Sequence, residues 1–184
     1  MRGLDGVART CEDAARGKLA AVQGGYYKDD FLRSFTSPLP RSPGPLINRG
    51  HYLRVAALDT ICARFLCSAG LERAQIVSLG AGLDTRFWQL DALGMRARRF
   101  IEVDQPDVVA RKCAAVSSQH TLLSALPEGV DGLGPSGIHS PASGYTLIAA
   151  DLCDVAQLAS ALSAGGWEPM CPTLLIAECV EPQP

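Results

Sequence analysis

The chain has 184 residues, of which 47% are hydrophobic and 20% charged, and a formal net charge of −2. That length allows one domain with its own hydrophobic core, and the composition is ordinary for a globular protein. The charge gives no support to a nucleic acid or a membrane surface as partner. The sequence lacks an apolar run of roughly 18 residues and an apolar signal segment, so we expect a cytoplasmic protein. We also expect a monomer.

The chain contains seven cysteines and three histidines. No two cysteines form a C-x-x-C pair, and the histidines are remote from one another in sequence. Scattered cysteines in odd number are typical of reduced, mostly buried thiols rather than of a disulfide framework or a metal site. We therefore expect no metal.

The first 46 residues predict two helices and a connector. Residues 11–23 are rich in alanine with interspersed charges, and a pair of glycines ends this helix. Residues 26–35 carry aromatic and apolar side chains at helical spacing and predict a second short helix. Residues 36–46 contain four prolines and a glycine, which indicates a loop.

An amphipathic helix is expected over residues 47–70, with Gly70 as its end. Its apolar side chains recur at steps of three and four residues. They are Tyr52, Val55, Leu58, Ile61, Phe65 and Leu66.

Short apolar runs then alternate with helical stretches. This alternation predicts an α/β fold, in which helices cover both faces of a parallel sheet. The Gly-, Pro- and Ser-rich residues 127–144 are expected to form an exposed, mobile loop. The strands are expected over residues 75–79, 99–104, 144–151 and 172–178, and the helices between them over 83–93, 107–117 and 155–164.

Each expected strand ends in a glycine turn or an acidic residue. The four ends carry Gly80 and Gly82, Asp104, Asp151 and Glu178. In an open α/β sheet, ligands bind beyond the carboxyl ends of the strands. The sequence therefore predicts a binding site at that edge.

The glycine turn follows a strand and opens a helix. Gly80 and Gly82 allow positive φ and let a ligand lie against the backbone. Asp104 follows about twenty residues later at the end of the next strand, where a carboxylate accepts hydrogen bonds from ribose hydroxyls. This spacing indicates a cofactor that contains a ribose.

Two cofactors fit that spacing, and the local charge favours one of them. A nicotinamide dinucleotide prefers a third glycine where this chain has Thr85, and Asp84 would repel a diphosphate. S-adenosylmethionine carries a sulfonium and an ammonium group and no phosphate. We therefore favour S-adenosylmethionine over the dinucleotide.

Five residues are candidates for other contacts with this cofactor, and several of them have a competing interpretation. Lys18 and Arg54 could bind the carboxylate of the cofactor, although composition alone makes each of them a surface charge. Asp151 and Leu152 could hold the adenine, although Asp151 could instead cap the following helix. Glu178 follows a run of apolar residues of the kind that is usually buried, which favours a role in the site.

These stretches resemble the leucine carboxyl methyltransferases, which transfer a methyl group from S-adenosylmethionine to the C-terminal leucine carboxylate of the protein phosphatase 2A catalytic subunit. The most specific motifs are LGAGLDTRFW (79–88) and IAECV (176–180). The resemblance covers the chain up to Val180. The other matching stretches are residues 11–18, 47–55, 100–112 and 150–154.

The resemblance implies a Rossmann-like methyltransferase domain and a set of cofactor contacts. Residues 47–184 would form its N-terminal half, and residues 1–46 would act as a lid over cofactor or substrate. No catalytic acid or base is implied, because the substrate carboxylate is already ionised. The implied contacts are Lys18 and Arg54 for the methionine carboxylate, Gly80 beneath the cofactor, Asp104 for the ribose, Asp151 and Leu152 for the adenine, and Glu178 near the methionyl end.

Family members continue beyond the last matching strand, whereas residues 181–184 do not resemble that continuation. We therefore expect a truncated form with an open hydrophobic edge at its last strand and weak or absent activity. One alternative is a non-catalytic cofactor-binding protein. Another is the related branch that methylates a modified base of phenylalanine tRNA, which the net charge does not favour.

Overall fold

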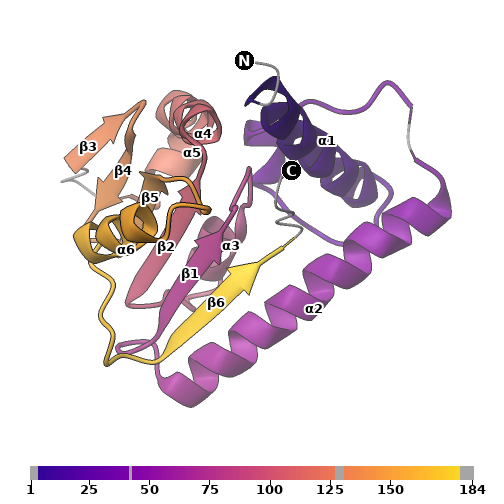
Figure 1. Ribbon diagram of the computed structural model, residues 1–184. Coiled ribbons are helices and arrows are strands. Elements are labelled where there is room, and N and C mark those ends of the chain that lie inside the picture. The colour runs from indigo at the N-terminus through magenta and orange to yellow at the C-terminus, as the bar shows by residue number, and fades with distance from the viewer. Residues whose placement is uncertain (1–3, 42, 127–130, 179–184) are drawn as a thin grey trace.

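The computed structural model describes residues 4–41, 43–126 and 131–178, which form helices around one six-stranded sheet (Figure 1). The helices are α1 (Leu4–Gln23), a 3-10 turn η1 (Leu32–Ser34), α2 (Pro45–Ala69), α3 (Arg86–Ala92), α4 (Pro106–Ser118), α5 (His120–Leu123) and α6 (Val155–Ala164). The strands are β1 (Gln75–Leu79), β2 (Arg99–Asp104), β3 (Asp131–Gly134), β4 (Gly137–Ser140), β5 (Tyr145–Ala149) and β6 (Thr173–Ala177).

The sheet has the strand order β3-β4-β5-β2-β1-β6. The four strands expected from the sequence, β5, β2, β1 and β6, pair in parallel. Leu79 of β1 lies opposite Val103 of β2 and Ala177 of β6. The carboxyl ends of these strands therefore meet at one edge, which confirms the predicted α/β fold.

A hairpin replaces most of the loop that we expected over residues 127–144. β3 and β4 pair antiparallel with each other, and β4 pairs antiparallel with β5. Gly137 has a φ of 150°, and a Cβ there would lie 2.4 Å from the carbonyl oxygen of Leu147. These short strands are held by that close pairing rather than by strand propensity. Because they are rich in glycine, their composition is typical of a loop. Residues 127–130 lie outside the described part.

The helix expected over residues 26–35 does not form, and only the 3-10 turn η1 is present. The carboxylate of Asp29 accepts hydrogen bonds from the backbone N–H groups of Phe31 and Leu32, at 3.0 and 3.1 Å. Its other oxygen accepts a bond of 2.6 Å from the hydroxyl of Thr85. Asp29 thus stabilises a turn that joins the N-terminal region to the start of α3, and a continuous helix would break this link.

The two faces of the sheet have separate hydrophobic cores. On one face, Ile76, Phe100 and Tyr145 are buried against residues from α1 to α5. On the other face, Val77 and Ile101 are buried against α6. The expectation of helices on both faces is therefore confirmed, and α6 begins and ends at the predicted residues.

The apolar stripe predicted on α2 is only partly buried. Val55 and Leu66 belong to the core, but Tyr52 and Ile61 are exposed. β6 is the last strand of the sheet order, and its Leu175 is 64% exposed. The expected open edge at the last strand is thus present among the described residues. None of the described helices is both long and apolar enough to cross a membrane.

Substituting alanine for glycine should have opposite effects on stability at two positions in the long helices. A Cβ at Gly17 of α1 would lie 2.3 Å from Nε2 of His51 on α2, whereas a Cβ at Gly50 would meet nothing within 4 Å. We expect Gly50→Ala to raise the free energy of unfolding by about 0.5–1 kcal/mol through helix propensity. Gly17→Ala should lower it by about 1–3 kcal/mol through overpacking. Urea unfolding measures both changes.

His51→Ala supplies the matched control for this pair. In its background the space beside Gly17 is open, so Gly17→Ala should lose its penalty. A Gly17→Ala variant as stable as Gly50→Ala in the presence of His51 would contradict the close packing of α1 on α2.

Candidate functional site

Four chain segments converge beyond the carboxyl edge of the sheet, as Figure 1 shows at the tips of β1, β2, β5 and β6. Gly80 directly follows β1, and its N–H donates to the carbonyl oxygen of Val103 at 2.8 Å. The N–H of Ala150, after β5, donates to the carbonyl oxygen of Asp104 at 3.0 Å. Glu178 follows β6 directly. The structure thus brings the predicted strand ends together at one edge.

The turn after β1 is held by the carboxylate of Asp104. Gly80 and Gly82 have φ values of 65° and 57°, a conformation that favours glycine. The N–H of Gly82 donates to Oδ2 of Asp104 at 2.6 Å, and the N–H of Gln105 donates to Oδ1 at 2.7 Å. Asp104 therefore connects the glycine turn to the end of β2.

Asp104 is only 7% exposed, and this burial raises its pKa although the two backbone N–H groups oppose the rise. Each carboxylate oxygen accepts one hydrogen bond from the backbone, and a carboxylate oxygen has a second lone pair that can accept another. The carboxylate can therefore hold the turn and still accept a hydroxyl of a ligand. Its predicted role with a ribose remains a prediction.

Lys18, Arg54 and Glu178 form an ion cluster at the β6 end of the edge. Nζ of Lys18, from α1, lies 3.3 Å from Oε2 of Glu178, and Nη2 of Arg54, from α2, lies 2.7 Å from Oε1. The side chains of Lys18 and Glu178 are mostly buried, whereas that of Arg54 is half exposed. The structure thus brings together two cations and a carboxylate that are far apart in sequence.

The acidic side chain of the turn is paired, which corrects the charge argument made from the sequence. Asp84 forms an ion pair with Arg86, and Nε of Arg86 also donates to Oδ1 of Asp59 at 3.2 Å. Burial alone would raise the pKa of Asp84, but Arg86, Lys18 and Lys112 outweigh it and lower the pKa to about 2. The negative charge is present, but Arg86 balances it, so Asp84 argues less strongly against a diphosphate than we expected.

Asp151 does not cap the helix that follows it. The N-cap of α6 is Asp154, whose carboxylate accepts a hydrogen bond from the N–H of Gln157 at 2.9 Å. Asp151 instead accepts from the N–H of Cys153 at 2.9 Å, and its side chain is exposed. Leu152 is half buried and packs on the core beneath α6. Of the two interpretations of Asp151, the helix cap is therefore excluded.

Three features around the site were not predicted from the sequence, and two of them are packing contacts. Sγ of Cys11 lies 3.1 Å from the position of a Cβ at Gly82, so Cys11 packs against the glycine turn. His51 packs against Gly17, and burial together with Arg54 and Lys18 lowers its pKa. A glycine inside a helical pattern was the available signal for the second contact.

A third unpredicted feature is the complete burial of Lys112 behind the turn. Among the described residues, no three His, Cys, Asp or Glu side chains are placed to hold a metal ion. The six cysteines of the described part are free.

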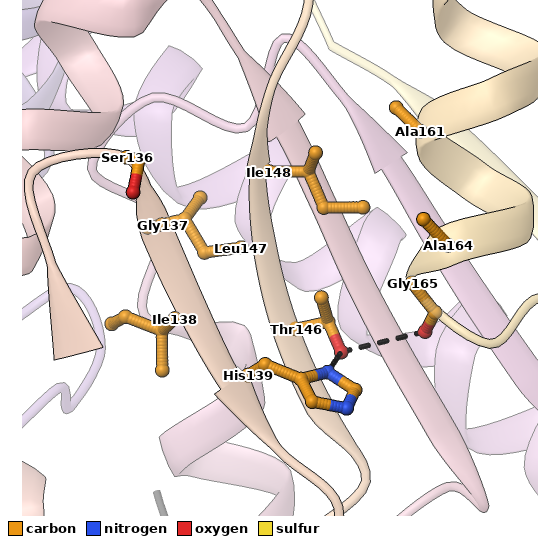
Figure 2. A pocket seen from close by; sticks show the side chains of 10 residues that line it. All are labelled: Ser136, Gly137, Ile138, His139, Thr146, Leu147, Ile148, Ala161, Ala164 and Gly165. Carbon is orange, nitrogen blue, oxygen red and sulfur yellow. Dashed lines mark hydrogen bonds between the residues drawn. The ribbon is translucent and has the colours of Figure 1, made fainter. Parts of the chain in front are cut away.

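A hollow of about 230 Å³ lies away from these residues, between β4, β5 and α6 (Figure 2). Ile148 and Ala161 form part of its apolar wall. Nδ1 of His139 lies 3.1 Å from the hydroxyl of Thr146, which donates to the carbonyl oxygen of Gly165 at 3.5 Å. None of the candidate residues at the carboxyl edge lines this hollow.

Comparisons with known proteins match nearly the whole chain. The family model described as leucine carboxyl methyltransferase matches residues 8–182. Leucine carboxyl methyltransferase 1 of Bos taurus is 35% identical over 178 residues, which cover 96% of this chain and 53% of the relative. The Arabidopsis thaliana homologue of leucine carboxyl methyltransferase 1 is 35% identical over 181 residues, which cover 95% of this chain and 52% of the relative.

A relative with a different name is also similar. The tRNA wybutosine-synthesizing protein 4 of Homo sapiens is 33% identical over 184 residues, which cover 97% of this chain and 27% of that protein. The chain thus spans about half the length of the leucine carboxyl methyltransferases that it matches.

The ion pair of Asp84 should make stability depend on pH in the acid range. The pKa of Asp84 falls from an ordinary 3.8 to about 2 on folding, so its ionised form stabilises the fold by about 2 kcal/mol above pH 4. That contribution is lost as the pH falls through about 2, and roughly half of it remains near pH 3. Urea unfolding of the wild type and Asp84→Asn at about pH 7, 4 and 3 measures the difference.

We expect the difference between these two proteins to be constant from neutral pH to about pH 4 and to narrow below that. Asp13→Asn, at an exposed position of α1, serves as a control and should match the wild type at each pH. An undiminished difference at pH 3 would show that Asp84 does not pair with Arg86 as an ionised group.

Proposed function

The chain belongs to the leucine carboxyl methyltransferase family, and on that premise we propose that it binds S-adenosylmethionine and provides the cofactor-binding half of a methyltransferase. The proposed substrate is the C-terminal leucine carboxylate of the protein phosphatase 2A catalytic subunit, in the cytoplasm. The observation that carries the proposal is the cluster of Lys18, Arg54 and Glu178 beside the glycine turn.

The cluster suits the methionyl end of the cofactor, which carries one carboxylate and one ammonium group. Lys18 and Arg54 already hold a carboxylate, that of Glu178, with contacts of 3.3 and 2.7 Å. A ligand carboxylate can take the same donors, and Glu178 can then accept from the ammonium group. The residues present therefore match both charges of the ligand.

The remaining contacts follow along the sheet edge from β6 to β5. Gly80 and Gly82 present backbone without side chains beneath the ligand. Asp104 retains acceptor capacity for ribose hydroxyls, and Asp151 with Leu152 offers a carboxylate and an apolar surface for the adenine. The edge from Glu178 to Asp151 spans three strand spacings, or about 14 Å, which suits an elongated ligand.

The chemistry would require little from the protein. S-adenosylmethionine supplies an electrophilic methyl group on a sulfonium. A carboxylate substrate is ionised at neutral pH, so no side chain needs to remove a proton, and we assign no catalytic acid or base. The chain's residues would align the cofactor and exclude water. Residues 1–46 would serve as a lid, since Lys18 of α1 contacts Glu178 across the site.

A second candidate function is cofactor binding without methyl transfer. The chain spans about half the length of its leucine carboxyl methyltransferase relatives, so substrate contacts can lie in the half that it does not match. The tRNA-modifying relative suggests a third candidate, but the net charge of −2 gives no electrostatic support for RNA.

Isothermal titration with S-adenosylmethionine tests the proposed binding. Lys18→Met should weaken binding by about 10- to 100-fold, because it removes a charge-assisted hydrogen bond from a mostly buried position. Arg64→Met removes an exposed cation from α2 and should leave the affinity unchanged. Equal affinities of the wild type and Lys18→Met would argue against the cluster as the methionyl site.

Methyl transfer is measured separately with a peptide that ends in the phosphatase tail and a matched peptide amide. Transfer to the free carboxylate and not to the amide supports the proposed reaction. Binding without transfer supports the second candidate function, and an absence of binding by a folded wild-type chain would overturn the proposal.

A further inference from the structure

Lys112 is a fully buried cation on α4, directly behind the glycine turn. Its Nζ lies 2.6 Å from Oε2 of Glu102, a buried residue of β2. The same Nζ donates to the backbone carbonyl oxygen of Asp84 at 2.6 Å. The aromatic rings of Phe35 and Trp88 lie 5.6 and 5.5 Å from this ammonium group.

The counter-ion of this cation is itself fixed from the sheet. Oε2 of Glu102 accepts a second hydrogen bond, of 2.6 Å, from the hydroxyl of Tyr145 on β5. Burial raises the pKa of Glu102 and Tyr145, although the contact with Lys112 opposes the rise for Glu102. Lys112, Glu102 and Tyr145 are each fully buried and form one polar cluster in the core.

A buried ion pair contributes little net stability, because desolvation offsets the attraction between the charges. Stability alone therefore does not account for the ammonium group in this core. Its hydrogen bond to the carbonyl oxygen of Asp84 is the distinctive contact, because it reaches backbone outside the ion pair. Asp84 ends the stretch that begins at Gly80, so the bond from Lys112 fixes the far end of the glycine turn.

The near end of the turn is fixed by the neighbouring strand. The carbonyl oxygen of Val103 accepts from the N–H groups of Gly80 and Ala81 at 2.8 and 3.2 Å, and Asp104 accepts from Gly82. At the far end, the N–H of Asp84 donates to the carbonyl oxygen of Ala81 at 3.1 Å, and the Asp84 side chain pairs with Arg86. The bond from Lys112 holds the backbone carbonyl oxygen of Asp84 and ties this end of the turn to α4.

We propose that Lys112 is a positioning residue, which holds the glycine turn in the shape that receives the cofactor. The carboxylate of Glu102 keeps its ammonium group in place. This inference rests on the proposed binding of S-adenosylmethionine, and it adds a residue that does not touch the ligand. Its direct physical effect, the order of the turn, is measurable without any ligand.

The test is the double variant Lys112→Met with Glu102→Gln. Changing both residues avoids an unpaired buried charge, so the chain is expected to fold. Amide hydrogen exchange is measured at Gly82 and Asp84 in the turn and at Val77 in β1. We expect exchange at the two turn amides to accelerate about tenfold or more while Val77 stays protected, and the dissociation constant for S-adenosylmethionine to rise about tenfold.

Tyr145→Phe is the matched control. It removes the hydroxyl that contacts Glu102 and leaves the bond from Lys112 to Asp84 in place. It should lower the melting temperature without changing exchange in the turn or the affinity. If methionine prevents folding, Lys112→Gln in the same Glu102→Gln background replaces it with a neutral polar group, and the same expectations apply.

The outcomes separate this inference from the proposed function. A folded double variant with wild-type exchange at Gly82 and Asp84 overturns the positioning role. Accelerated exchange in the turn with unchanged affinity shows that the order of the turn does not govern binding, and also overturns it. A wild-type chain that does not bind S-adenosylmethionine overturns the proposed function, while turn exchange still decides whether Lys112 orders the turn.

Discussion

The carboxylate of Asp104 makes the connection on which the candidate site depends. It accepts backbone N–H groups from Gly82, after β1, and from Gln105, after β2, and so joins two strand ends that are more than twenty residues apart. The positive φ of Gly82 turns its N–H toward this acceptor. Parallel pairing of β1 with β2 and β6 then places Glu178 at the same edge. The geometry of the edge follows from register, one carboxylate and two glycines.

Three carboxylates around this edge lie in local pairs or clusters with cations. Arg86 balances Asp84, Lys112 balances Glu102, and Glu178 lies between Lys18 and Arg54. A cation next to each carboxylate offsets part of the free-energy cost of removing that carboxylate from water. These carboxylates are therefore balanced by specific cationic partners and not by a general positive field.

The strands and long helices could be predicted from the sequence because their signals are local. β1 and β2 are short apolar runs beside turn residues, and α6 has clear helical periodicity. The hairpin of β3 and β4 could not be predicted in this way, because pairing with β5 holds it. The candidate residues at strand ends were found because parallel strands share an edge. Lys112 was missed because lysine is a surface type, and its partners are distant in sequence.

The contacts of Glu178 have a consequence for how any ligand enters. A carboxylate that arrives at Lys18 and Arg54 meets donors that are already engaged, so its entry is an exchange of one anion for another. Folding already holds the side chains of Lys18 and Arg54 in place. Binding a ligand there would therefore not cost their conformational entropy a second time. The electrostatic gain of such an exchange is small, since the contacts made resemble those broken. An incoming molecule that also carries a cation would give the released carboxylate of Glu178 a new partner. A simple anion would leave that carboxylate without its two cationic partners. The difference in affinity between the two kinds of ligand would therefore come from Glu178.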